Sequence, residues 1–220
     1  MSTETTAAND PNIMIGVRIP VAVTAAHAHL TRTVIEQLFC DLYQLHPRGP
    51  PIRGEYDSFE TVTLIGPHGR LRKVPVVGPP ILANQIEISR TEALILGIRT
   101  PVRESGDLIG TPGLTIEGPR SQVVLGTGLI CPLRHIHMNP MEAVQFNLKD
   151  RDRVEVSIRT TNRSLRFDDV LVRVAAPYSM ELHLDSDEAN AAGVQSGDFA
   201  MLVRRSSAND VANVSAGSNI

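Results

Sequence analysis

Two stretches of the chain share one pattern: VAVTAAHAHLT at Val21–Thr31 and LICPLRHIHMN at Leu129–Asn139. In each, an apolar strand-like run leads into a His-x-His pair and then into an aliphatic residue or methionine. A residue suited to capping a helix N-terminus follows, and at Asn139 a proline comes next, at the first helical position. This echo predicts two related halves, each of which presents a pair of histidines at the end of a strand.

Outward from these two stretches, most of the chain shows the pattern of short strands separated by turns rich in glycine and proline. The runs at 60–65 and 71–77, joined by Gly66-Pro67-His68-Gly69, are typical of a hairpin. A second pair is expected at 114–117 and 122–125 and a third at 154–159 and 170–174, with further strands at 180–184 and 199–203.

Helices are predicted to be few and short. One runs from Arg32 to about Leu42, with Thr31 as its N-cap. In three others an alanine is followed four residues later by glycine or asparagine, which tolerate the left-handed conformation that ends a helix: Ala93–Gly97, Ala143–Asn147 and Ala189–Gly193. Short helices on a β-rich body predict a mainly β fold of small barrels capped by short α-helices.

Composition excludes several classes of protein. The 220 residues carry 21 Lys and Arg against 24 Asp and Glu, which argues against electrostatic binding of nucleic acid. No apolar run approaches the roughly 20 residues of a membrane-spanning helix, and the polar start lacks the pattern of a secretory signal. We therefore expect a cytoplasmic protein, with a disordered lead-in over 1–12 and a disordered tail over 206–220.

The histidines carry the chemistry. His27 with His29, and His135 with His137, are spaced so that both imidazoles of a pair face the same side of a strand. Imidazole pairs suit zinc and its first-row neighbours. His183 lies on a further predicted strand, but its neighbouring acids are expected to face away or lie beyond it.

Three other residues have more than one interpretation each. Glu87 lies in an apolar alternation and is either an inward carboxylate or a surface residue. Ser105 lies in a glycine-containing loop that either cradles an anion through backbone donors or is an ordinary turn. Cys131 is a ligand, a nucleophile or, as we favour, a small buried thiol. The nucleotide-binding loops and the serine-hydrolase elbow are absent from the sequence.

Taken in order, these motifs resemble the PduL-type phosphate propanoyltransferases, the phosphotransacylases of bacterial microcompartments. The resemblance extends from about Pro20 to Val203 and is carried by five segments: VTAAHAHL at 23–30, EISRT at 87–91, SGD at 105–107 followed by GTPG at 110–113, RHIHM at 134–138, and ELHLD at 181–185 followed by DEANAAG at 187–193.

The resemblance implies two barrel domains, one formed by 13–25 with 133–205 and the other by 26–132, with two zinc ions between them. One zinc would be held by His27, His29 and Glu87, and the other by His135, His137 and His183. The reaction implied is reversible acyl transfer between CoA and inorganic phosphate, so that acyl-CoA and phosphate are the partners. A homodimer is expected, in the cytoplasm or in the lumen of a microcompartment, where shell or cargo proteins would be further partners.

Phosphate is itself the nucleophile in such a reaction, so no catalytic serine or cysteine nucleophile is needed. Ser105 is expected to donate to the phosphate. The chain departs from the family at two positions, since Ile81 and Ala26 stand where relatives usually carry arginine. A bidentate arginine is the natural clamp for phosphate. Either another cation takes its place, with Arg90, Arg134 and Arg103 as the candidates, or phosphate binding is weak, or the substrate has changed. The alternatives are a catalytically weakened metal-binding homologue with an assembly role, and a zinc thioester hydrolase.

Overall fold

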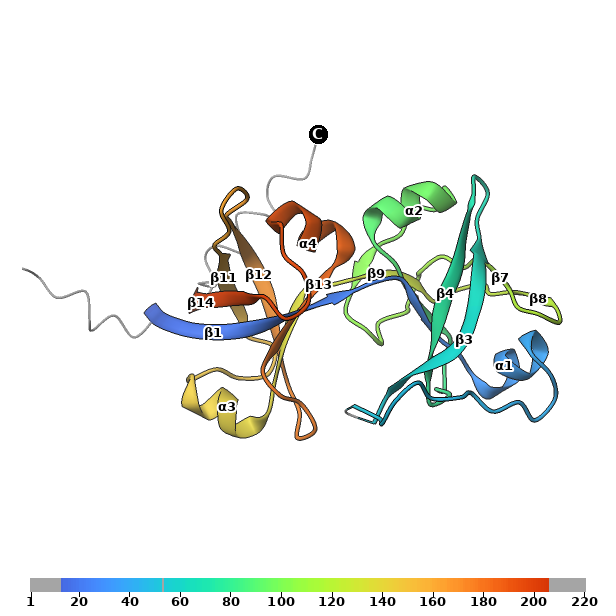
Figure 1. Ribbon diagram of the computed structural model, residues 1–220, viewed down its shortest axis with the longest axis horizontal. Helices are drawn as coiled ribbons and strands as arrows, with labels where there is room; N and C mark the ends of the chain where they lie inside the picture. The colour runs from blue at the N-terminus through green and yellow to red at the C-terminus, as the bar shows by residue number, and fades with distance from the viewer. Residues whose placement is uncertain (1–12, 53, 206–220) are drawn as a thin grey trace, which may run out of the picture. The chain divides into compact units, whose positions relative to one another are not determined.

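A computed structural model describes residues 13–52 and 54–205 (Figure 1). The mainly β class is confirmed, because strands make up most of the regular structure. The strands are β1 (Ile13–Thr24), β2 (His27–His29), β3 (Tyr56–Ile65), β4 (Arg70–Gly78), β5 (Gln85–Glu87), β6 (Val102–Arg103), β7 (Thr115–Glu117), β8 (Gln122–Val124), β9 (Leu129–Pro132), β10 (His135–Met138), β11 (Arg153–Ile158), β12 (Leu165–Val174), β13 (Glu181–Asp185) and β14 (Phe199–Arg205).

The helices are α1 (Arg32–Leu38), α2 (Arg90–Leu96), α3 (Pro140–Gln145) and α4 (Ser186–Ala192). Among the described residues none of these helices is long and apolar enough to cross a membrane. The lead-in expected over 1–12 and the tail expected over 206–220 lie outside the described residues.

The chain divides into two compact units. Within the described residues, unit 1 comprises 13–23, 134–184 and 188–205, and unit 2 comprises 24–52, 54–133 and 185–187. Unit 1 is a closed barrel of strand order β1-β13-β10-β12-β11-β14. Its interior is aliphatic and includes Ile136, Val156, Val172 and Leu182, each fully buried.

Unit 2 is built on one eight-stranded sheet of order β6-β9-β5-β2-β4-β3-β7-β8. This sheet curls around its own aliphatic core, which includes Leu30, Ile35, Leu64 and Ile86. It does not close, because β9 and β7 pair with the short outer strands β6 and β8 instead of with each other. Of the two expected barrels, unit 1 is therefore closed and unit 2 is a curled half-barrel.

The two units repeat one arrangement of strands. The order β9-β5-β2-β4-β3-β7 in unit 2 matches β1-β13-β10-β12-β11-β14 in unit 1, position by position. Each His-x-His strand has one parallel neighbour (β4 or β12) and one antiparallel neighbour (β5 or β13). The repeated histidine motif therefore lies at equivalent positions in two sheets that share one strand order.

The short helices follow their predicted signals, with one correction. Thr31 caps α1 as expected, but the helix ends at Leu38 and not near Leu42, whose φ is 58° and whose side chain is 84% exposed. The apolar spacing that suggested a longer helix is broken there, because Leu42 faces solvent. Gly97, Asn147 and Gly193 all adopt positive φ after α2, α3 and α4, as their residue types predict.

A buried carboxylate stabilises the start of the β3–β4 hairpin. Glu60 on β3 is 7% exposed and accepts hydrogen bonds from the Tyr43 hydroxyl (2.9 Å), the His46 backbone (3.1 Å) and His46 Nδ1 (2.7 Å). Burial alone raises the pKa of Glu60, but the bonds from His46 and Tyr43 outweigh it and lower this pKa to about 2. The carboxylate therefore ties the 43–46 loop to the sheet while it is ionised.

We expect Glu60→Gln to lower the free energy of unfolding at pH 7 by about 2 kcal/mol, since the amide NH2 would face buried donors. Because the folded-state pKa lies below the ordinary value near 4.5, this stabilisation is present above that value and is lost as pH falls towards about 2. Urea unfolding of both proteins between pH 7 and pH 3 measures the difference. Glu117→Gln, at a partly exposed ion pair with Arg70, is the control. A difference that does not shrink on acidification would contradict the assignment.

Candidate metal centres and active site

The first candidate centre, here called the carboxylate centre, comprises His27, His29 and Glu87 in unit 2. His27 and His29 come from β2, and Glu87 comes from the antiparallel strand β5, directly opposite His27. The two imidazole centroids are 5.0 Å apart at an interplanar angle of 79°. Glu87 and His29 are buried, at 6% and 8% exposed. Glu87 is therefore the inward carboxylate and not the surface residue that the sequence left open.

The ring of His27 is oriented by its own backbone neighbour. Its Nδ1 lies 3.0 Å from the carbonyl oxygen of Ala25, which can only accept a hydrogen bond, so Nδ1 carries the proton. In the neutral ring Nε2 then presents a lone pair, 3.6 Å from Glu87 Oε2. That distance is close to the roughly 3.4 Å that separates two zinc ligands, each about 2.1 Å from a tetrahedral ion. These two atoms are spaced to share a divalent ion, but among the described residues a set of three ligand atoms within 4.8 Å of one another is found at the three-histidine centre described below and not at His27, His29 and Glu87.

His29 is held neutral. Burial, and then the neighbouring charge of His27, lower the pKa of His29 to about 4, although Glu87 acts in the opposite direction. At neutral pH this imidazole therefore carries a lone pair with which it can ligate a metal.

Glu87 is also fixed by a hydrogen-bond network. Its Oε1 accepts from Ser105 Oγ at 2.5 Å and from Gln85 Nε2 at 2.7 Å. The amide oxygen of Gln85 accepts in turn from the backbone N–H of Gly106, at 2.7 Å. The structure thus brings the predicted Ser105 loop to the predicted carboxylate. Sequence reasoning missed Gln85, although its spacing from Glu87 places both side chains on one face of β5.

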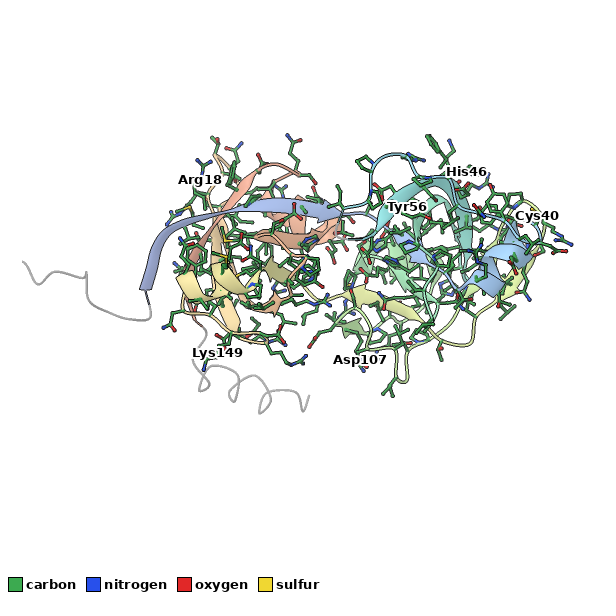
Figure 2. All side chains as sticks on the ribbon, turned by 90° about the horizontal axis from the view of Figure 1, so that it is seen from below. Arg18, Cys40, His46, Tyr56, Asp107 and Lys149 are labelled. Carbon is green, nitrogen blue, oxygen red and sulfur yellow. The ribbon has the colours of Figure 1, made fainter. Side chains whose placement is uncertain are left out.

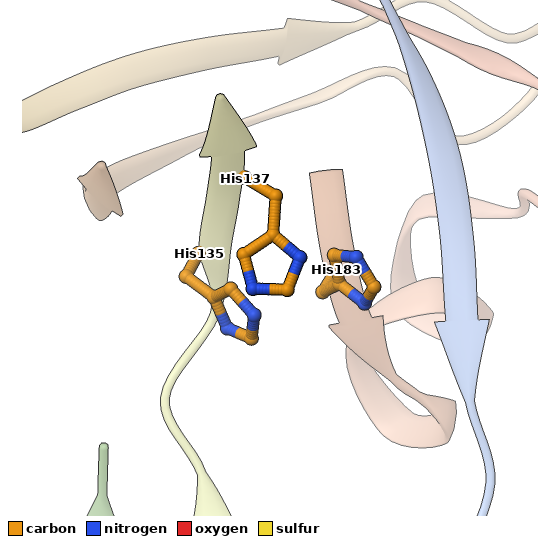
Figure 3. A group of neighbouring side chains, drawn as sticks. All are labelled: His135, His137 and His183. Atoms are coloured by element: carbon orange, nitrogen blue, oxygen red, sulfur yellow. The ribbon is translucent and has the colours of Figure 1, made fainter. Parts of the chain in front are cut away.

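The second candidate centre, here called the three-histidine centre, comprises His135, His137 and His183 in unit 1 (Figure 3). His135 and His137 lie on β10, and His183 lies on β13 opposite His135. One ring nitrogen from each residue lies within 4.8 Å of the others, so the group could hold a metal ion. Among the described residues, no other group of three His, Cys, Asp or Glu side chains brings its ligand atoms within 4.8 Å of one another.

Two residues beside this centre were not predicted. Tyr178 stacks on His137 with ring centroids 3.8 Å apart, and Glu181 Oε2 lies 3.1 Å from His183 Nε2. The expectation that the acids next to His183 face away or lie beyond it is wrong for Glu181, because residues two apart on β13 face the same side. Tyr178 lies in a loop and carries no signal in the sequence.

The predicted arginines differ in their surroundings. In unit 1 the Arg134 guanidinium donates to the Asp168 carbonyl from Nε and Nη2 and to Glu188 from Nη1 (2.9 Å). In unit 2 Arg90 is the exposed first residue of α2. Arg103 lies two residues before Ser105, with its Nε 3.5 Å from Asp107.

The two departures from the family pattern lie in unit 2. Ala26 is 8% exposed and belongs to the aliphatic core. Ile81 is partly buried, and its backbone N–H donates to the Leu30 carbonyl at 3.0 Å. Neither residue brings a charge.

Cys131 on β9 is 2% exposed, and its Sγ lies 3.6 Å from Asp185 Oδ2. A thiol so buried cannot meet a dissolved substrate, which agrees with the favoured interpretation as a core residue. The other cysteine, Cys40, is exposed at the periphery of unit 2 (Figure 2).

The structure is thus mainly β, with one group of three histidines that could hold a metal ion and a second His-His-Glu group in which Glu87 is hydrogen-bonded to Ser105. Comparison with known proteins gives the class. The family model for phosphate propanoyltransferase matches residues 20–195. Phosphate propanoyltransferases from Thermotoga maritima and Citrobacter koseri are 45% and 44% identical, over 88% and 84% of this chain and 90% and 89% of theirs. The relative of the same name from Salmonella typhimurium is 41% identical over 84% of the chain and 89% of its own.

The chain is therefore an acyltransferase. It belongs to the phosphate propanoyltransferase family, whose reaction is acyl transfer between CoA and phosphate.

In the native protein we expect one cysteine to react rapidly with a thiol reagent such as Ellman's reagent, because only Cys40 is exposed. Cys131 should react only after unfolding. The Cys40→Ser variant should show no rapid reaction and should keep its acyltransferase activity, and Cys131→Ala should also remain active. Rapid reaction of both thiols in the folded wild type would contradict the buried assignment.

Proposed function

We propose that this chain is a zinc-dependent phosphotransacylase that transfers a short acyl group reversibly between CoA and inorganic phosphate. The observation that carries the proposal is the repeated placement of ligands. Each unit sets a His-x-His strand against an antiparallel strand whose ligand lies opposite the first histidine. The family resemblance extends the proposal to a homodimer in the cytoplasm or in the lumen of a bacterial microcompartment.

In the forward direction an oxygen of phosphate adds to the carbonyl carbon of the thioester. The carbon–sulfur bond then breaks, and its electron pair leaves with the CoA sulfur, which takes a proton from solvent. The products are an acyl phosphate and the free CoA thiol. A divalent zinc ion supplies Lewis-acid stabilisation of the anionic oxygens in such a reaction.

The residues have separate roles in this proposal. His27, His29 and Glu87 hold one zinc ion, and His135, His137 and His183 hold the other, with three protein ligands each so that a position stays open. Ser105 and the Gly106 backbone lie beside Glu87 and form the phosphate-facing loop. Arg90, which is exposed, and Arg134, which adjoins His135, supply positive charge towards the anionic substrate.

We expect zinc-loaded protein to release CoA thiol from propionyl-CoA only when phosphate is present. Metal analysis should give about two zinc ions per chain, and His29→Ala and His137→Ala should each lose about one. Each loss should lower kcat by at least about 100-fold, since a removed charge no longer stabilises the reacting oxygens. Thiol release is followed with a chromogenic disulfide, and acyl phosphate is trapped with hydroxylamine.

The controls separate the alternatives. Thiol release without phosphate would replace the proposal with thioester hydrolysis. Metal-loaded protein with no release would replace it with the weakened, metal-binding homologue that Ile81 and Ala26 suggest. Glu117→Gln, at the ion pair with Arg70, tests for general damage and should leave kcat unchanged.

A second prediction concerns the missing clamp. Ile81→Arg should lower the KM for phosphate about tenfold or more, because a guanidinium binds phosphate through paired donors. Ile81→Gln, which adds polarity without charge, is the matched control and should leave KM close to the wild-type value. An unchanged KM in Ile81→Arg would mean that the cation already comes from elsewhere, and Arg90→Gln and Arg134→Gln would then be compared.

A further inference from the structure

Gln85 is a buried amide next to the carboxylate centre. Its side chain is 7% exposed and lies on the same strand as Glu87, two residues away. It bonds to Glu87 on one side and to the loop that carries Ser105 on the other. Since a buried amide without partners is costly, both bonds contribute to holding this region in one arrangement.

The two partners fix which way the amide points. The Gly106 N–H can only donate, so it must face the oxygen of Gln85, and the NH2 group then faces Glu87 Oε1. A flipped amide would set oxygen against carboxylate and NH2 against N–H. The carboxylate therefore has Oε1 engaged by donors, while Oε2 faces His27 Nε2.

The serine bond differs in kind from the glutamine bond. A hydroxyl has one proton, and that of Ser105 is given to Glu87 Oε1 at 2.5 Å. Ser105 can donate to phosphate only when it releases Glu87. Gln85 has no such second duty, because its NH2 remains on Oε1 whichever way the hydroxyl turns.

We propose, on the basis of the proposed function, that Gln85 is the positioning residue of the carboxylate centre. It holds Glu87 Oε1 so that Oε2 alone faces the metal, and it keeps this orientation when the Ser105 hydroxyl turns to phosphate. Because the Gln85 amide keeps Glu87 in place, the Ser105 hydroxyl is free to donate to phosphate. Partners of this kind commonly change metal affinity by 10- to 100-fold when removed.

The test uses the full chain with cobalt(II) as a spectroscopic replacement for zinc. A His137→Ala background confines the measurement to the carboxylate centre. Gln85→Met keeps the side-chain volume and removes both hydrogen bonds. We expect it to weaken cobalt binding by about 10- to 100-fold in chelator competition and to shift the visible cobalt absorption. Ser105→Ala should leave cobalt affinity within about threefold of the parent and, with His137 restored, raise the KM for phosphate.

Two further variants guard against a purely structural effect. Ser58→Ala removes a fully buried hydrogen bond to the Val76 carbonyl in the same unit, and it should leave cobalt affinity and spectrum unchanged. Gln85→Glu keeps the length and the acceptor for Gly106 but sets a second carboxylate against Glu87. We expect Gln85→Glu to weaken cobalt binding as well. It therefore provides the test if Gln85→Met does not fold.

The possible failures are distinct. Wild-type cobalt affinity and spectrum in folded Gln85→Met or Gln85→Glu would overturn the positioning role and leave the proposed function standing. Equal losses in Ser58→Ala and Gln85→Met would also overturn it, because the effect would then be general. A parent protein that binds no cobalt at His27, His29 and Glu87 would overturn the proposed function itself.

Discussion

The register of two short antiparallel strand pairs is the constraint on which both centres depend. In β2–β5, His27 lies opposite Glu87, and in β10–β13, His135 lies opposite His183. A slip of one residue would turn the facing side chains to the other side of the sheet and dismantle the ligand set. The parallel neighbours β4 and β12, and the aliphatic cores beneath them, hold these three- to five-residue strands in place.

The repeat gives two centres of equal topology, each with a carboxylate beside its histidines. At the carboxylate centre Glu87 lies opposite His27, and at the three-histidine centre Glu181 Oε2 lies 3.1 Å from His183 Nε2. The carboxylate at the first centre has a further use, since an oxygen not facing the metal can accept from Ser105 and Gln85. An imidazole at that position could not join the ligand to a serine loop in this way.

Much of this arrangement can be predicted from the sequence, and the missing parts have physical causes. The strands and helix ends carry local signals, such as Gly66-Pro67-His68-Gly69 at a hairpin and Gly97 at positive φ. The matched His-x-His pairs predict the two halves. Strand closure depends on long-range pairing, so nothing local distinguishes the closed barrel from the half-barrel. Tyr178 reaches His137 through the tertiary fold alone, and Gln85 has no feature of its own in the sequence until Glu87 is known to face inward.

The chain changes units just before each histidine pair. β1 pairs within the barrel of unit 1, yet it leads directly into β2 of unit 2, while β9 pairs in unit 2 and leads into β10 of unit 1. Unit 1 is consequently built from segments far apart in sequence, with β1 lying between β14 and β13. Since β13 carries His183, the third histidine of the three-histidine centre lies on a strand that pairs with one from the start of the chain. β1, which precedes the first histidine pair, thus belongs to the barrel that carries the second pair, and β9, which precedes the second pair, belongs to the sheet that carries the first. Each centre therefore depends on strands from both halves of the sequence.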